Sequence, residues 1–519
     1  MTLFKGFATV GAMTLASRVL GFVRDMLIAS VLGTGAVADA FFVAFRFPNL
    51  FRRLFAEGAF NAAFVPLFAK RLEGEGREAA RGFAREALAA LPAVLLILPA
   101  VAEITMPGLM YFIAPGFADT PDKYDLAVKL TRITFPYLLC VSLVALLSGM
   151  LNALHRFALA AFAPVLLNIV FIIVLGGLVM SGERNSPQAG EALAWAVFVG
   201  GVAQLLALIY GARREGMGLK LQRPRLTEGV RRLLVLAIPG IIAGGITQIN
   251  ILIGTIIATL QDKAVSWLYY ADRIYQLPLG VVGIAIGIVL LPDLSRKLRA
   301  GDKDGAVEAK NRSLEFAMLL TLPAAVALVA APEPIIRVLF ERGAFTDADA
   351  TATAAALAAF AAGLPAFVAI KVFSPAFFAR EDTRTPMIYA GISVVVNIIG
   401  SLSMFFIIGH VGIAIATTLA GWVNAALLGG TLMRQGVFHF DSQFRRRIGP
   451  ICLSSLLMGG AVWLLALQLA PYFYPAHGVV IQVGALALLV GGGLAVYLGA
   501  AHLTGGAHVP TLLRRLIGR

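Results

Sequence analysis

The sequence predicts an all-α protein that crosses a membrane many times. Hydrophobic residues make up 59% of its 519 residues, and only 14% are charged. Apolar runs recur from end to end, and many of them reach the roughly 20 residues that a helix needs to span a bilayer. The loops between the runs alternate in basic charge. We therefore expect a polytopic membrane protein with fourteen transmembrane helices, which form two six-helix lobes and a C-terminal pair.

The apolar runs locate the expected helices, because charged, glycine or proline residues bound each run. The first run follows Lys5 as a signal peptide would, but Arg18 and Asp25 come next without a cleavage site. We therefore expect an uncleaved first helix. The predicted spans are 7–33, 36–66, 86–113, 126–153, 158–181, 191–212, 230–260, 264–294, 312–340, 349–379, 385–408, 411–433, 448–470 and 478–502.

Several predicted spans contain proline. Because proline removes a backbone hydrogen bond and its ring clashes with the preceding turn, each one is expected to bend or break its helix. These positions are Pro48, Pro92, Pro136, Pro278 and Pro365.

The basic residues of the connecting loops predict the orientation. With the N-terminus inside, the inside segments hold 29 of the 43 lysines and arginines, and the outside loops hold four. Cytoplasmic loops carry such an excess, so both termini are expected in the cytoplasm. This topology explains most of the net charge of +14, and no nucleic-acid-binding module is recognisable. The four outside residues are Lys123, Arg184, Lys263 and Arg342.

Two halves of the chain resemble each other at an offset of about 227 residues. The matched pairs are AFR at 44–46 with ADR at 271–273, PGFADT at 115–120 with RGAFTDAD at 342–349, and Asn168 with Asn397. Each half holds six predicted helices, so both enter from the same side and form a parallel repeat. Such repeats are typical of transporters, whose substrate site lies between the halves. The predicted parts are the lobes 1–222 and 223–436, followed by the two extra helices in 437–519.

Charged residues lie inside the apolar runs, above all in the first two. An arginine at the centre of a membrane helix costs roughly 2.5–3.5 kcal/mol on insertion scales. Arg18 and Asp25 are seven residues apart, as are Asp39 and Arg46, so we expect each pair to meet on one helix face. Five arginines against three acids still leave surplus guanidinium groups, which suit a phosphate-bearing anion. The alternative is structural pairing, or snorkelling at helix ends.

Other classes of function have little support in the sequence. The dipeptide Gly-Lys never occurs, so there is no Walker A loop, and the six histidines and two cysteines show no metal or disulfide spacing. We expect no catalytic residue, no metal site and no cofactor. Coupling to sodium or chloride stays open. The oxygens available to a sodium ion would come from Asn250, Asn397, Thr417 and Thr418, although such residues more often pack helices together.

Segments along the whole chain resemble the MurJ/MviN family of bacterial lipid II flippases, a branch of the multidrug/oligosaccharidyl-lipid/polysaccharide (MOP) exporter superfamily. They are SRVLGFVRD (17–25), FFVAFRFPNLFRRLFAEGAFNAAFVPLFA (41–69), APGFADT (114–120) and QDKAVSWLYYADR (261–273). The resemblance implies transport of lipid II, an undecaprenyl pyrophosphate with a disaccharide-pentapeptide, from the cytoplasmic to the periplasmic leaflet of the inner membrane. It further implies alternating access between the lobes and a groove for the lipid tail on the last two helices.

The resemblance also assigns site residues. The residues that match substrate-binding positions of the family are Arg18, Arg24, Asp39, Arg46, Arg52 and Arg273. Further candidates for a gate or for the cavity wall are Ser17, Asp25, Arg53, Glu57 and Lys371. Glu57 is expected either to line the cytoplasmic entrance or to cap a broken helix, and Lys371 to be either a cavity charge or a structural one. One turn after Arg273, Gln276 replaces an acidic residue of some relatives.

Alternatives for the cargo stay open at this point. Another polyprenyl-linked oligosaccharide would suit the same arginines, whereas drug exporters need acidic and aromatic cavities. The segment 52–60 favours lipid II through the resemblance. A membrane enzyme acting on polyprenyl phosphates would need Asp, Glu or His clustered at a membrane face, and the long loops that carry such catalytic residues are missing, because most predicted outside loops are short. Whether the predicted loop 70–85 contacts cell-wall synthesis proteins also stays open.

Overall fold

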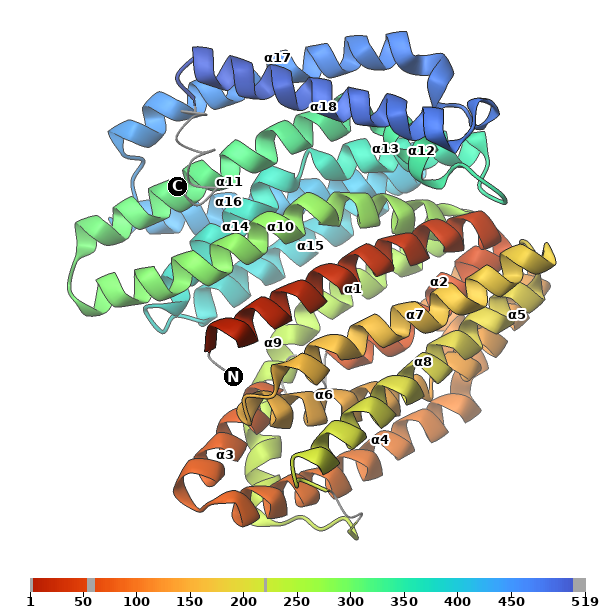
Figure 1. The fold of residues 1–519 in the computed structure, drawn as a ribbon, viewed down its shortest axis with the longest axis vertical. Coiled ribbons are helices and arrows are strands. Elements are labelled where there is room, and N and C mark those ends of the chain that lie inside the picture. Colours follow the sequence, from red (N-terminus) through yellow and green to blue (C-terminus); the bar gives the residue numbers. More distant parts are fainter. Residues whose placement is uncertain (1–2, 54–60, 219–221, 507–519) are drawn as a thin grey trace. The chain divides into compact units, whose positions relative to one another are not determined.

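The structure is a computed structural model that describes residues 3–53, 61–218 and 222–506, and within them the regular elements are helices (Figure 1). The chain divides into two compact units, Met1–Ser266 with Gly343–Phe345, and Trp267–Arg342 with Thr346–Arg519. The first unit contains α1 (Leu3–Leu32), α2 (Ala36–Phe51), α3 (Asn61–Gly74), α4 (Arg77–Ile113), η2 (Pro115–Phe117), α5 (Pro121–Thr134), α6 (Tyr137–Ala153), α7 (Phe157–Ser181), α8 (Pro187–Arg214) and α9 (Glu228–Thr259).

The second unit begins within the first turn of α10 (Ala264–Arg299). Its other helices are α11 (Lys303–Ala330), α12 (Pro332–Phe340), α13 (Asp347–Ala361), α14 (Leu364–Phe378), α15 (Arg384–Ile408), α16 (His410–Arg434), α17 (Ser442–Leu469) and α18 (Val479–Leu503), with the 3-10 turns η3 (Ala470–Phe473) and η4 (Pro475–His477) between the last two.

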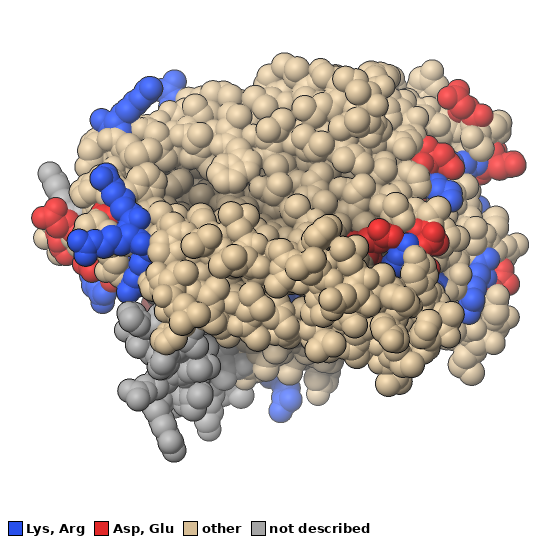
Figure 2. Space-filling model, turned by 90° about the horizontal axis from the view of Figure 1, so that it is seen from above, with Lys and Arg blue, Asp and Glu red and all other residues tan. Residues whose placement is uncertain are grey.

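Within the described residues, each predicted span overlaps one helix or two consecutive helices. Among the described residues, 10 segments are long and apolar enough to cross a membrane. On the face drawn in Figure 2, most Lys, Arg, Asp and Glu side chains gather near two ends and leave a broad stretch of uncharged surface. The expected class, an all-α polytopic membrane protein, is confirmed.

Two predicted spans are broken at proline, as expected. Pro136 separates α5 from α6, and Gly363 separates α13 from α14, whose first turn holds Pro365. Proline has no amide hydrogen to donate, so it is tolerated at the start of a helix and not in its interior hydrogen-bond ladder. Pro48 and Pro92 instead lie inside α2 and α4.

The helices extend beyond the apolar runs that predicted them. The segment 70–85 was expected to be a loop, and this is wrong, because α3 continues to Gly74 and α4 begins at Arg77. A run of hydrophobic residues indicates the part of a helix that lies in the hydrocarbon layer. Lysine, arginine and glutamate have about the same helix propensity as leucine, so a helix can continue through them into water. Hydropathy therefore located the membrane crossing and not the ends of these helices.

The internal repeat is visible in the helix pairings of each unit. In the first unit, α4 packs against α5 and α6, and α8 packs against α5, α6 and α7. In the second, α11 packs against α13 and α14, and α16 packs against α13, α14 and α15. The same order of elements thus makes the same pairings twice, which supports two related lobes. The lobe boundaries after residues 222 and 436 stay a prediction, and α9 is grouped with the first unit.

The last two helices form an antiparallel pair attached to the second unit. α17 packs along α11 and α18, and α18 also touches α12. The Tyr497 hydroxyl on α18 donates to the Leu319 carbonyl of α11 at 2.6 Å. The pair covers a cluster of buried apolar residues that includes Val338 and Phe473.

Candidate functional site

Arg24 is held by a network between α1 and α7. Its Nε and Nη2 atoms donate to Asp25 Oδ1 at 3.0 and 2.8 Å, and its Nη1 atom donates to Asn168 Oδ1 at 3.0 Å. Its guanidinium carbon also lies 5.4 Å from the centre of the Phe171 ring. The Arg24 and Asp25 side chains are only 11% and 4% exposed. Arg24 is therefore fixed in position by charge-assisted hydrogen bonds within the first unit.

The network extends to Ser17 and leaves Arg18 outside. Asn168 Nδ2 donates to the Ser17 carbonyl at 2.9 Å. Arg18 lies on the exposed face of α1. The expected pair of Arg18 and Asp25 is wrong, since the carboxylate turns to Arg24, the adjacent residue, whose long side chain can reach it.

Asp39 lies at the centre of a second, closed cluster. It is 0% exposed, and its Oδ2 atom accepts from Lys123 Nζ at 2.8 Å and from the Lys263 amide at 3.0 Å. Its Oδ1 atom accepts from the Ser266 amide at 3.0 Å and from the Ser266 hydroxyl at 2.6 Å. Such donors offset the large cost of burying a carboxylate. The substrate-binding role of Asp39 stays a prediction, and in this conformation protein donors surround its carboxylate.

Arg46 was expected to pair with Asp39, and this is also wrong. Arg46 Nη1 donates instead to Thr255 Oγ1 at 2.6 Å, which joins α2 to α9. The Thr255 hydroxyl in turn donates a hydrogen bond to the Ile251 carbonyl at 2.8 Å. Asp39 lies nearer the start of α2, where the turn that follows α9 can reach it. The two partners of the expected pair therefore fasten α2 to α9 and its following turn at two separate points.

The end of α2 carries the next two predicted arginines. Arg52 is half-buried and its Nε atom donates to Asn49 Oδ1 at 3.0 Å, whereas Arg53 is exposed. Glu57 lies outside the described residues, so its expected role stays a prediction. Arg52 and Arg53 thus hold positive charge at the surface of the helix end.

Arg273 and Lys371 are the predicted site residues of the second unit. The Arg273 side chain is 31% exposed, its Nη2 atom lies 4.0 Å from Asp272 Oδ2 and its guanidinium lies 4.7 Å from the Tyr269 ring centre. Gln276 donates to the same Asp272 carboxylate. An aspartate beside the arginine therefore supplies the negative charge that the sequence lacks at Gln276. Lys371 is exposed on α14.

Three of the four residues proposed to offer oxygens to sodium take part in helix packing. Asn397 Oδ1 accepts from Ser401 Oγ at 3.4 Å and from Thr417 Oγ1 at 3.2 Å, between α15 and α16. Thr418 Oγ1 donates to the Ala359 carbonyl of α13 at 2.7 Å. These contacts match the packing alternative for polar groups between membrane helices.

A groove of about 310 Å³ lies between α17 and α18. Its wall is apolar except for Gln468, and Gly492 and Gly493 form part of it. A Cβ atom on Gly493 would approach Val462 Cγ2 to 2.6 Å, so glycine permits the two helices to pack closely. The mainly apolar lining of the groove is chemically compatible with an alkyl chain.

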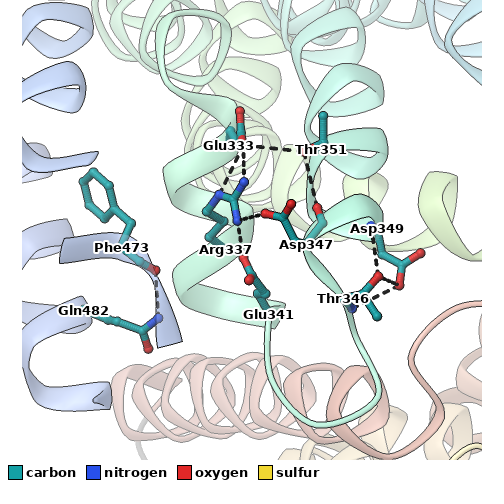
Figure 3. Close-up of polar contacts among 9 residues, drawn as sticks. All are labelled: Glu333, Arg337, Glu341, Thr346, Asp347, Asp349, Thr351, Phe473 and Gln482. Atoms are coloured by element: carbon teal, nitrogen blue, oxygen red, sulfur yellow. Dashed lines mark hydrogen bonds and ion pairs between the residues drawn. The ribbon is translucent and has the colours of Figure 1, made fainter. Parts of the chain in front are cut away.

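A separate charged cluster fastens the short helix α12. Arg337 is 6% exposed, and it pairs with Glu333, Glu341 and Asp347 (Figure 3). Its guanidinium lies 4.5 Å from the ring centre of Tyr474, in the connection between α17 and α18. Burial raises the pKa of Glu341, although the Arg337 charge opposes this shift. The cluster joins α12 to the start of α13 and to the 470–478 connection.

Sequence reasoning missed the partners that hold the predicted residues. Lys123 was expected in an outside loop, yet it lies in the first turn of α5 and is 6% exposed. Asn168 was noted only for its match with Asn397 in the repeat, and Thr255 carried no signal beyond being a polar residue in an apolar run. All three lie more than 80 residues from the charges that they contact, and periodicity reports only on neighbours three, four or seven positions away.

Comparison with known proteins places the chain among transporters of one kind. A family model described as lipid II flippase MurJ matches residues 28–483. The chain is 49% identical to the probable lipid II flippase MurJ of Rhizobium tropici, over 99% of this chain and 97% of the relative. It is 35% identical to the lipid II flippase MurJ of Burkholderia cenocepacia, over 90% and 91% of the two chains.

Solved structures give the same picture. The fold is similar to that of a lipid II flippase MurJ in an inward closed conformation, with a TM-score of 0.77, 25% identity and coverage of 98% of this chain and 99% of that chain. A multidrug resistance MATE family transporter of the MOP superfamily, in an inward-facing conformation, is similar in fold with a TM-score of 0.67 at 15% identity, over 85% of this chain and 99% of that chain.

Proposed function

The chain belongs to the lipid II flippase family MurJ, and we propose that it carries lipid II from the cytoplasmic to the periplasmic leaflet by alternating access between its two lobes. The observation that carries this function is identity of 49% to a named relative over 99% of the chain. Lipid II is the precursor of peptidoglycan, so the protein acts in cell wall biogenesis and in the maintenance of cell shape.

The arginines are assigned to the pyrophosphate of lipid II. Guanidinium groups form paired hydrogen bonds to phosphate oxygens and keep their charge in a low dielectric. Arg18 and Arg53 are exposed and Arg52 and Arg273 are half-buried, which leaves surface for a ligand. Arg24, fixed by Asp25 and Asn168, has a set position before substrate arrives. A preorganised donor loses less entropy on binding, which supports its assignment to the headgroup site.

The polyprenyl tail is assigned to the groove between α17 and α18. Each methylene group that leaves an apolar environment for water costs roughly 0.8 kcal/mol, so the tail has to stay in contact with lipid or with apolar protein during transport. A groove with mainly apolar walls supports this assignment.

The protein is a membrane transporter, and its place and orientation are proposed from charge. We assign it to the bacterial inner membrane with both termini in the cytoplasm, because the segments with most Lys and Arg are expected there. We further propose that it performs no covalent chemistry and that no cofactor is needed. Sodium and chloride are the candidate ions for driving the return of the empty transporter to the inward-facing state. Contact of segment 70–85 with cell-wall synthesis proteins is kept as a proposal.

A competition experiment with purified protein in vesicles tests the cargo. Fluorescent lipid II is placed in one leaflet, and its transfer is followed while unlabelled lipid II or a polyprenyl pyrophosphate with an O-antigen-type glycan is added. We expect lipid II to compete and the other glycan to compete weakly, with both lipids recovered covalently unchanged. Stronger competition by the other glycan would reassign the cargo, and covalent turnover would make the protein an enzyme.

A further inference from the structure

Lys123 connects three parts of the first unit that are distant in sequence. Its Nζ atom lies 2.8 Å from Asp39 Oδ2 on α2 and 2.8 Å from Asp262 Oδ1 in the turn after α9. The ammonium group also lies 4.5 Å from the centre of the Phe117 ring in η2. The lysine itself belongs to the first turn of α5. One buried charge thus joins α2, α5 and the turn at 260–263.

The same cluster attaches α2 to the start of α10. Asp39 accepts from the backbone amides of Lys263 and Ser266, and Ser266 is the third residue of α10. The first amides of a helix have no partner within the helix and carry partial positive charge, so a carboxylate there acts as a cap. Here the cap comes from another helix and depends on Lys123 to balance its charge.

Next to this cluster, the backbone of η2 packs directly against the end of α9. A Cβ atom on Gly116 in η2 would lie 2.0 Å from the Thr259 carbonyl oxygen at the end of α9. Thr259 itself is 2% exposed. Because no side chain fits between them, the segment before α5 and the end of α9 touch through their main chains. Any widening at this end of the first unit has to separate this contact and the Lys123 ion pairs together.

The ion pair is specific to the first half of the internal repeat. Ser266 lies 227 residues after Asp39, and Asp349 is the third residue of α13 as Lys123 is the third residue of α5. Asp349 caps α13 through the Thr346 amide at 3.0 Å and accepts from Trp267 Nε1 at 3.3 Å. The second half therefore has a carboxylate where the first half has the ammonium group, so duplication alone does not explain Lys123.

We propose that Lys123 is a positioning residue of the transport cycle: it neutralises Asp39 and holds the outside ends of α2, α5 and α9 together, and this latch separates when the transport path opens to the outside. The inference rests on the proposed alternating access and on the predicted topology, which places the loops 114–125 and 261–263 outside. Removal of the lysine leaves a buried carboxylate without its counter-charge, which disfavours the closed arrangement.

The test measures opening directly and does not need the substrate. Thr259→Cys supplies a thiol that the closed cluster buries, and a membrane-impermeant maleimide is added to purified protein in vesicles. With Lys123→Met, which keeps the length and removes the charge, we expect labelling at least roughly tenfold faster than with Lys123. Lys123→Arg should restore slow labelling. Lys129→Met, on the same helix and exposed, is the matched control and should label as slowly as the parent.

Two further arms keep the test decisive. If Lys123→Met fails to fold, the variant with both Asp39→Asn and Lys123→Met, which leaves no unpaired buried charge because Asp262 is exposed, should fold and still label fast. Slow labelling of every folded variant that lacks Lys123 would overturn the latch. Failure of the parent to move lipid II would instead overturn the proposed function, whatever the labelling rates show.

Discussion

Asn168 on α7 accepts a hydrogen bond from Arg24 on α1 at 3.0 Å and donates one to the Ser17 carbonyl at 2.9 Å. One asparagine thereby fixes both a guanidinium group and the backbone of the helix that carries it. This relationship makes Asn168 a supporting residue for the proposed headgroup site, although no sequence motif assigns it that role.

Asn168→Leu is expected to reduce lipid II transport while the protein remains folded. A hydrogen bond to a charged group contributes about 1.5–3 kcal/mol, so its loss should weaken headgroup binding by roughly tenfold or more. The measurement is lipid II transfer in vesicles as a function of lipid II concentration. The control is Gln204→Leu, which removes a buried hydrogen bond from Gln204 Nε2 on α8 to the Ala163 carbonyl on α7 at 2.8 Å. Equal effects of the two variants would reduce Asn168 to a packing role.

Gly116→Ala should destabilise the protein by about 1–3 kcal/mol, because the added methyl group has to displace the main chain at Thr259. Gly176→Ala in α7 is the matched control, since nothing lies within 4 Å of its Cβ position and alanine favours helix. Thermal unfolding in detergent measures both. A Gly116→Ala variant as stable as the parent would show that the main chains at Gly116 and Thr259 can separate enough to accommodate a methyl group.

The raised pKa of Glu341 leads us to expect that the stability of the folded protein depends on pH. Burial raises its pKa in the folded state, so its contribution is complete below the ordinary glutamate pKa of about 4.3 and is lost as pH rises through the raised value. The charged groups around it are Arg337, Glu333 and Asp347. Glu341→Gln should therefore flatten the fall in unfolding temperature above about pH 5.

The control for this experiment is Glu333→Gln, which removes a more exposed carboxylate from the same arginine. Unfolding temperatures are measured in steps from about pH 4 to 8 for all three proteins. A variant at Glu341 that keeps the slope of the parent would contradict the assignment.

Val496→Trp should obstruct the lipid-tail groove. Val496 lines the groove between α17 and α18, so an indole there fills space assigned to the polyprenyl chain. We expect lipid II transfer to fall several-fold and transfer of a short-chain analogue to fall less. Val490→Trp, on α18 and 57% exposed outside the groove, is the control. If both tryptophans have the same effect, the tail follows another path.

Much of the fold could be predicted from the sequence because bilayer thickness imposes one length on every span. In the part of the chain that the structure describes, the fourteen predicted runs all overlap helices, and the breaks near Pro136 and Pro365 follow from missing amide hydrogens. The ends of α3 and α4 could not be predicted, because charged residues continue a helix as well as they end a hydrophobic run.

The role of the candidate site residues stays a prediction, whereas their pairings in the fold could not be predicted from the sequence. Arginines within apolar runs are costly, so they indicated a site. The partners of Asp39 could not be found, because Lys123 lies in the polar stretch PDKYD, which resembles any loop. Its burial depends on the packing of η2 against α9, a contact between segments more than 130 residues apart.

The central claim, that the arginines bind the lipid II pyrophosphate, is tested most directly in bacteria depleted of their own lipid II flippase. The gene is supplied unchanged, with Arg18→Ala, with Arg273→Ala, or with Arg184→Ala as a control in an exposed loop. The fraction of labelled lipid II on the periplasmic face is then measured at matched protein levels. We predict exposure with the parent and the control and its loss in the other two variants. Full exposure with Arg18→Ala and Arg273→Ala would contradict the account of the arginines.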